Sequence, residues 1–175
     1  TKFINKDMLV ALQEQEDNSV VLITAFWSLG YSEPNKVLKE IVRVLIPGGQ
    51  VGILVNTKES LLELQKLISK ILIRHPFVLK CIPPINFPSN IKNFRSMVNK
   101  VGLRIKSLRE ETCEQFFDSG ELLVSWMRIS GPCAGFRGAL KENHRDFVFN
   151  KIKELVNHTG GVKLTFRFLY FIGTK

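Results

Sequence analysis

The chain has 175 residues, enough for one domain with a real hydrophobic core. Hydrophobic residues make up 45% and charged residues 23%, which excludes a disordered chain. The net charge of +9 suits an acidic substrate, a nucleic acid or an acidic partner surface, although scattered charges also fit an ordinary solvated surface. No apolar run could span a bilayer and the three cysteines form no CxxC pair, so we expect reduced thiols and a cytoplasmic location. The three histidines have no metal-ligand spacing, and we expect no metal.

The N-terminal quarter predicts a strand over residues 20–25, a continuous apolar and β-branched run typical of a buried strand. Phe26 and Trp27 follow at its carboxyl end, where open α/β sheets carry ligands, although both could equally be core residues. Residues 1–5 suggest the end of an earlier strand. Asp7 and Met8 come next, and Asp7 could simply be a turn or cap residue.

Residues 35–55 predict a helix, a stop and a buried strand. Apolar residues at helical spacing give the helix one core-facing stripe. Pro47 ends this helix, the two glycines after it turn the chain, and a strand follows over residues 50–55.

The remaining elements follow in a regular order. A loop over residues 74–89 contains four prolines, and a loop of this length is either a binding loop or an ordered connection. Asp118 is placed to cap a helix. Alternate residues from Val162 to Ile172 predict one core-facing side of a closing strand. The predicted helices are 59–73, 89–101, 120–129 and 140–156, and the predicted strands are 103–108 and 162–172.

One run of residues resembles the helix–Pro-Gly-Gly–strand signature of class I S-adenosylmethionine-dependent methyltransferases, although any helix-to-strand turn favours such residues. The step from the helix 89–101 into the strand 103–108 resembles a second motif of that family. The resemblance implies an α/β, Rossmann-like sheet with an antiparallel C-terminal strand. The run consists of Glu40, Ile41, Arg43, Val44, Leu45, Pro47, Gly48 and Gly49.

The same resemblance implies S-adenosyl-L-methionine as cofactor. It assigns Asp7 to the adenine amino group, Met8 to the adenine ring and Phe26 to the wall of the cofactor pocket, with Trp27 beside the substrate. No Gly-rich cofactor loop occurs in the sequence, so the chain reads as one partial domain (1–175) without the first strands of the family.

Residues 117–131 resemble the cap of carboxyl O-methyltransferases of the trans-aconitate and malonyl-carrier-protein type, and we expect a helical cap insertion over residues 110–145. Arg pairs well with carboxylates, so Trp126 and Arg128 are candidates for substrate binding. The alternative is a core tryptophan and a surface arginine.

These observations predict a methyltransferase domain that acts on a small molecule, with a carboxylate as the candidate acceptor. The alternative is an inactive methyltransferase-like scaffold, associated with RNA or a larger assembly. The strand 20–25 would leave unpaired backbone groups without a neighbouring strand on each side. We therefore expect that this chain is a fragment of a longer one, that a partner chain supplies the missing strands, or that the sheet is rearranged. The sequence leaves the catalytic residues, the substrate and the oligomeric state open.

Overall fold

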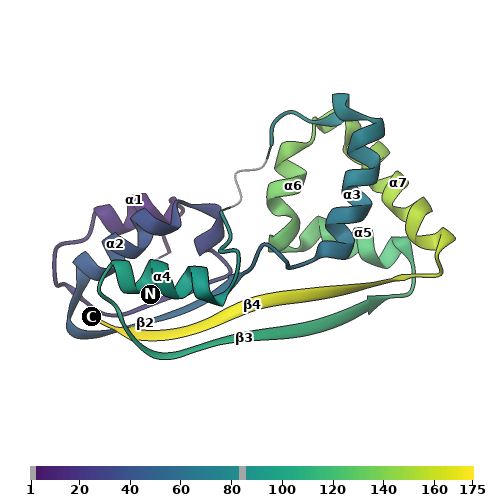
Figure 1. The fold of residues 1–175 in the computed structure, drawn as a ribbon. Coiled ribbons are helices and arrows are strands. Elements are labelled where there is room, and N and C mark those ends of the chain that lie inside the picture. The colour runs from purple at the N-terminus through teal and green to yellow at the C-terminus, as the bar shows by residue number, and fades with distance from the viewer. Residues whose placement is uncertain (1–2, 83–85) are drawn as a thin grey trace. The chain divides into compact units, whose positions relative to one another are not determined.

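The computed structural model describes residues 3–82 and 86–175 (Figure 1). Within them, none of the helices has the length and apolar character needed to cross a membrane. The strands are β1 (Val20–Phe26), β2 (Leu45–Asn56), β3 (Arg104–Phe117) and β4 (Val162–Thr174). The helices are α1 (Met8–Gln13), α2 (Pro34–Val44), α3 (Leu62–Arg74), α4 (Ile91–Lys100), α5 (Gly120–Ile129), α6 (Ala134–Ala139) and α7 (Arg145–His158).

The strands form one mixed sheet in the order β1-β2-β4-β3. Strand β1 lies parallel to β2, with Phe26 opposite Leu54, and the crossover between them contains α2. Strand β4 lies antiparallel to β2, with Gln50 opposite Thr174. The predicted α/β class with an antiparallel C-terminal strand is confirmed.

The chain divides into two compact units. Unit 1 consists of the described residues within Thr1–Lys58, Ile85–Glu111 and Arg167–Lys175, and unit 2 of those within Glu59–Pro84 and Thr112–Phe166. Strands β3 and β4 contribute residues to both units. The boundaries predicted for a single partial domain and for its insertion stay predictions.

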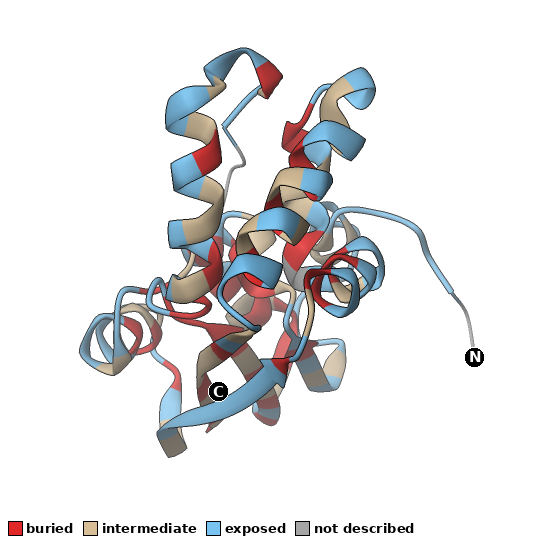
Figure 2. Cartoon of the chain, turned by 90° about the vertical axis from the view of Figure 1, so that its right-hand side faces the viewer, coloured by how far each residue is buried: buried red, intermediate tan, exposed pale blue. Residues whose placement is uncertain are grey.

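Helix α2 supplies much of the core of unit 1. Its apolar residues recur at helical spacing and are fully buried, and Figure 2 shows such buried positions alternating with exposed ones along the helices. Phe94 of α4 meets Phe171 of β4 edge-on, with ring centroids 5.6 Å apart. The buried α2 residues are Val37, Leu38, Ile41 and Val44.

Strand β1 is more exposed than its sequence predicts. Val21 is 65% and Leu22 is 59% exposed, whereas Ala25 is buried. The prediction of a buried strand is therefore wrong for this structure. Within the described residues β1 pairs with β2 alone, so it is an edge strand. A long apolar edge without charge or proline carries none of the usual protection against pairing.

The Pro-Gly-Gly segment belongs to β2 rather than to a turn before it. Helix α2 ends at Val44, and β2 begins at Leu45, five residues earlier than predicted. The pairing with β1 shifts register here, because Val20 lies opposite Leu45 but Leu22 lies opposite Gln50. Gly48 has a φ of +81°, which glycine adopts without strain. The extra residues form an irregularity in the strand.

Several other boundaries differ from the predictions. Residues 3–5 form no strand, and β3 continues to Phe117, well beyond the predicted residue 108. In unit 1, Leu169 and Phe171 of β4 are fully buried. They lie on the face opposite to the one predicted to face the core, because α4 packs against Phe171. Helix α7 begins at Arg145 rather than at residue 140. Pro83 and Pro84 of the predicted loop lie outside the described residues.

Helices α5 and α7 pack closely in unit 2 at Gly120. A Cβ atom at Gly120 would lie 2.4 Å from the Cα atom of Lys153, so only glycine fits. The Gly120 N–H donates to Oδ1 of Asn157 over 2.6 Å, which joins the start of α5 to the end of α7. Ser119, and not the predicted Asp118, caps α5 by accepting from the Leu122 N–H.

We predict that Gly120→Ala lowers the free energy of unfolding by about 2–3 kcal/mol, because the added methyl group meets backbone that cannot move aside. Gly138→Ala is the matched control, since a Cβ atom there has no neighbour within 4 Å and the residue lies in α6. The control should be neutral or gain about 0.5–1 kcal/mol from helix propensity. Urea unfolding followed by circular dichroism measures both, and equal effects would contradict the packing.

Candidate functional site

The carboxyl ends of β1 and β2 lie at the same edge of the sheet because the two strands are parallel. β1 ends at Phe26 and β2 at Asn56, and a loop of unit 1 follows each end. Ligands of open α/β sheets bind in the crevice outside such ends. The candidate site is therefore sought in these loops.

Trp27 turns the chain sharply after β1. Its φ of +57° is left-handed, a conformation that costs free energy for a bulky residue and is concentrated at functional sites. The Trp27 N–H donates to the Leu54 carbonyl over 2.8 Å, and the indole meets Phe168 edge-on with centroids 5.0 Å apart. Phe26 and Trp27 are still 56% and 40% exposed. Two large apolar side chains are thus presented to solvent at the strand end.

Helix α1 begins beside the same strand end. Asp7 caps it, because Oδ1 accepts from the Leu9 N–H over 2.8 Å and from the Val10 N–H over 3.4 Å. Ser28, one residue beyond Trp27, places its hydroxyl 3.9 Å from the sulfur of Met8. Asp7 is exposed, and within the described residues its Oδ2 atom accepts no hydrogen bond. The cap therefore leaves one carboxylate oxygen available for a ligand.

Arg43 joins α2 to α1 and to the segment that follows α1. Its guanidinium donates to the carbonyls of Leu12 (3.0 Å) and Gln15 (2.9 Å). It also forms ion pairs with Asp17 and Glu40. The hydrogen bonds that Arg43 donates to Asp17 and, second, to Glu40 raise the pKa of Arg43 above its usual value. This residue of the Pro-Gly-Gly signature therefore holds the helix whose start carries Asp7 and Met8.

Trp126 and Arg128 belong to unit 2, apart from the other four predicted residues. Trp126 is half-buried among aromatic rings, with centroids 5.5 Å from Phe117 and 5.9 Å from Phe166. Arg128 is paired with Asp146 at 2.7 Å and lies over the ring of Phe149. The assignment of both residues to the substrate stays a prediction.

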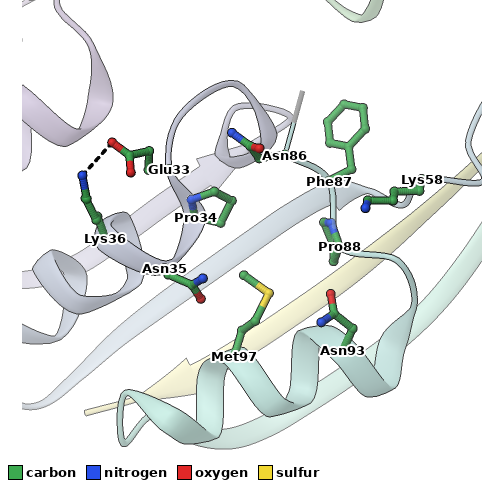
Figure 3. Close-up of a pocket in the computed structure, with 10 residues that line it drawn as sticks. All are labelled: Glu33, Pro34, Asn35, Lys36, Lys58, Asn86, Phe87, Pro88, Asn93 and Met97. Carbon is green, nitrogen blue, oxygen red and sulfur yellow. Dashed lines mark hydrogen bonds and ion pairs between the residues drawn. The ribbon is translucent and has the colours of Figure 1, made fainter. Parts of the chain in front are cut away.

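A pocket of about 510 Å³ lies in unit 1 beyond the strand ends (Figure 3). Its walls come from the start of α2, the residue that follows β2 by two positions, the segment before α4, and α4 itself. None of the six predicted site residues lines it. The lining residues are Glu33, Pro34, Asn35, Lys36, Lys58, Asn86, Phe87, Pro88, Asn93 and Met97.

Backbone contacts hold the pocket walls together. The ring of Phe87 rests directly on Gly30, where a Cβ atom would lie only 2.1 Å from it. The Asn86 N–H donates to the Gly30 carbonyl (2.8 Å), and the Lys58 N–H to the Pro88 carbonyl (3.0 Å). The segment before α4 is thus fixed to the loops after both parallel strands.

The pocket is polar and holds two lysines. Lys36 pairs with Glu33 at 2.9 Å, and Lys58 projects its amine along the pocket wall (Figure 3). The Asn93 Oδ1 atom accepts from the Ser89 N–H over 3.2 Å, which leaves its NH₂ group as a donor. Glu33 is the single carboxylate in the lining, and no three potential metal ligands gather in the described part of the chain. Such a lining suits recognition of an anion.

Sequence reasoning missed the pocket residues because they come from separate segments. The proline-rich loop prediction did include Asn86, Phe87 and Pro88. Asn93 and Met97 are one helical turn apart, a spacing that any helix contains. A lone lysine after a strand, such as Lys58, carries no motif at all.

Comparisons with known proteins find relatives of parts of this chain and of its fold. Residues 2–53 match the family model of a methyltransferase domain. A malonyl-[acyl-carrier protein] O-methyltransferase of Alcanivorax borkumensis is 26% identical over 114 residues, covering 65% of this chain and 36% of the relative. The chain therefore spans about a third of the length of that curated relative.

Solved structures share the fold. A protein of Bacillus halodurans assigned to the methyltransferases matches with a TM-score of 0.61 at 11% identity, over 100% of this chain and 78% of that one. The YcgJ protein of Bacillus subtilis matches with a TM-score of 0.51 at 12% identity, over 93% and 66%. The predicted resemblance is confirmed: this chain is similar to class I S-adenosylmethionine-dependent methyltransferases.

Proposed function

We propose that this chain is a methyltransferase domain that binds S-adenosylmethionine at the carboxyl end of β1 and methylates a carboxylate held in the adjoining pocket. One observation carries the proposal. The pocket is bounded by the loops after the two parallel strands, and the predicted cofactor residues stand at the end of the first of them. A cofactor and an acceptor would then meet at one edge of the sheet.

The residues at the end of β1 fit an adenosyl group. Asp7 offers a carboxylate oxygen that could accept from the adenine amino group. Met8 and Phe26 supply apolar surface, and the exposure of Phe26 leaves it free to be covered by a ring. When bound, the cofactor supplies a methyl group on a positively charged sulfur. The chain's own residues need only hold the nucleophile in line and exclude water.

A carboxylate acceptor explains why the pocket needs no acid–base pair. A carboxylic acid is ionised at neutral pH and is already a nucleophile. Its oxygen forms the new bond to the methyl group while the bond from that methyl to sulfur breaks, so no proton moves. The ammonium of Lys58 and the NH₂ group of Asn93 would hold the other oxygen. The malonyl group named for the Alcanivorax relative carries such a carboxylate.

The first prediction of this proposed function separates the two roles of Asp7. Asp7→Ala removes both the helix cap and the adenine contact. Asp7→Ser keeps an oxygen that can cap the helix, but its side chain is too short to reach a ligand as well. We expect both variants to bind S-adenosylhomocysteine about tenfold more weakly or worse, since a hydrogen bond to a charged group is lost. Only Asp7→Ala should lose thermal stability. Calorimetric titration and thermal melts measure the two effects, and full affinity in Asp7→Ser would leave Asp7 as a cap alone.

The second prediction concerns Lys58. Lys58→Met should lower kcat/KM for a malonyl thioester by about tenfold or more, mainly through a higher KM, because a charge-assisted hydrogen bond to the acceptor is lost. The matched control is Lys39→Met, an exposed lysine of α2 outside the pocket lining. S-adenosylhomocysteine affinity should stay unchanged in both. Equal kinetics for the two variants would argue against a carboxylate at Lys58.

A further inference from the structure

Helix α4 presents three distinct faces within unit 1. Phe94 and Val98 are fully buried against the core. Asn93 and Met97 line the pocket described above. The remaining face forms a shallow hollow of about 610 Å³, lined by Lys92, Arg95, Ser96, Asn99 and Lys100, and we call it the basic face.

The charges of the basic face are not neutralised by ion pairs with other described residues. Residues 86–109 contain six lysines and arginines and no aspartate or glutamate. Lys92, Arg95 and Lys100 are exposed, and within the described residues none of them forms an ion pair. Elsewhere on the surface the cations of α2 and α7 do pair with acids, as Lys36 and Lys151 show. A concentrated patch of one sign attracts a partner of the opposite sign.

The shape of the basic face favours a protein over a nucleic acid. Its residues recur at helical spacing over about 12 Å of the axis, from Lys92 to Lys100. An acidic helix can lie along a row of cations of this length and place its carboxylates beside them. Sites for single-stranded nucleic acid combine cations with aromatic rings on which bases stack, and no aromatic side chain lines this hollow.

We propose that the basic face of α4 is a docking surface for an acidic helical protein that carries the acceptor as a tethered group. The same helix lines the pocket with Asn93 and Met97, so a partner docked on one face would have its tether beside the other. The delivery of an acceptor rests on the proposed function, whereas the docking itself does not. Complementary charge of this kind speeds encounter and selects the partner.

The test compares two charge-reversed triples of identical composition. The first is Lys92→Glu, Arg95→Glu and Lys100→Glu on α4. The control is Lys66→Glu, Lys70→Glu and Arg74→Glu on α3, whose residues are also exposed and not ion-paired within the described part. The probe is acyl carrier protein with a malonyl group on its prosthetic arm, and binding is followed by fluorescence anisotropy at low and high salt. A third variant replaces Lys92, Arg95 and Lys100 by Gln. It removes the positive charges without adding negative ones, so it controls for misfolding caused by charge reversal.

We expect the α4 triple to bind the carrier protein about tenfold more weakly or worse, the Gln triple to show an intermediate loss, and the α3 triple to stay within about twofold of the parent chain. High salt should weaken binding of the parent chain and leave the α4 triple little changed. Equal affinity in both charge-reversed triples would overturn the proposal. So would an α4 triple that loses affinity for a single-stranded RNA but not for the carrier protein.

Methyl transfer to an untethered thioester separates this proposal from the proposed function. Malonyl N-acetylcysteamine has no carrier protein attached, so its methylation does not require a protein to dock on the basic face. If it is methylated equally by all variants while carrier binding depends on α4, both proposals stand. If it is methylated but carrier binding ignores α4, the docking proposal alone fails. If nothing is methylated while carrier binding still depends on α4, the docking surface stands and the proposed function fails.

Discussion

The parallel pairing of β1 with β2 is the constraint on which the rest of unit 1 depends. It brings two carboxyl ends to one edge, and the hydrogen bond from the Trp27 N–H to the Leu54 carbonyl continues the pairing beyond the last strand residue. The loops that leave these ends then meet the segment before α4 at Gly30 and Lys58. An antiparallel pair would send the two loops to opposite edges.

The two halves of the candidate site differ in chemical character. The end of β1 is apolar and aromatic, with a single carboxylate at Asp7. The pocket is polar and basic, and the helix beside it carries unpaired positive charge. A nucleotide-like cofactor suits the apolar first half, and an anionic acceptor suits the basic second half.

The sequence predicted strands β2 and β4 well because each has a clear local pattern. The Pro-Gly-Gly signature and the closing strand 162–172 located β2 and β4, and both lie where the resemblance implied. The exposure of β1 could not be predicted, since an apolar run looks the same whether or not a neighbour covers it. The early start of β2 escaped notice because Pro47 and the glycines read as a turn rather than as an irregular strand.

The candidate site was only half predictable. Asp7, Met8, Phe26 and Trp27 follow strand ends or family motifs and lie together in unit 1. Lys58 and Asn93 have no local signal, because tertiary contacts such as Phe87 on Gly30 decide what lines the pocket. Arg43 was read as a signature residue without a role, and the structure gives it one as the anchor of α1.

The three methionines of the chain offer the most direct test of the account. Met8 begins α1 beside the residues that follow β1, Met97 lines the pocket, and Met127 is fully buried in unit 2. With ¹³C-labelled methionine methyl groups, titration with S-adenosylhomocysteine should shift the Met8 signal, and a malonyl thioester added afterwards should shift that of Met97. The Met127 signal should not move in either step. A Met8 signal that stays fixed at saturating S-adenosylhomocysteine would contradict the account, because the cofactor would then bind elsewhere or not at all.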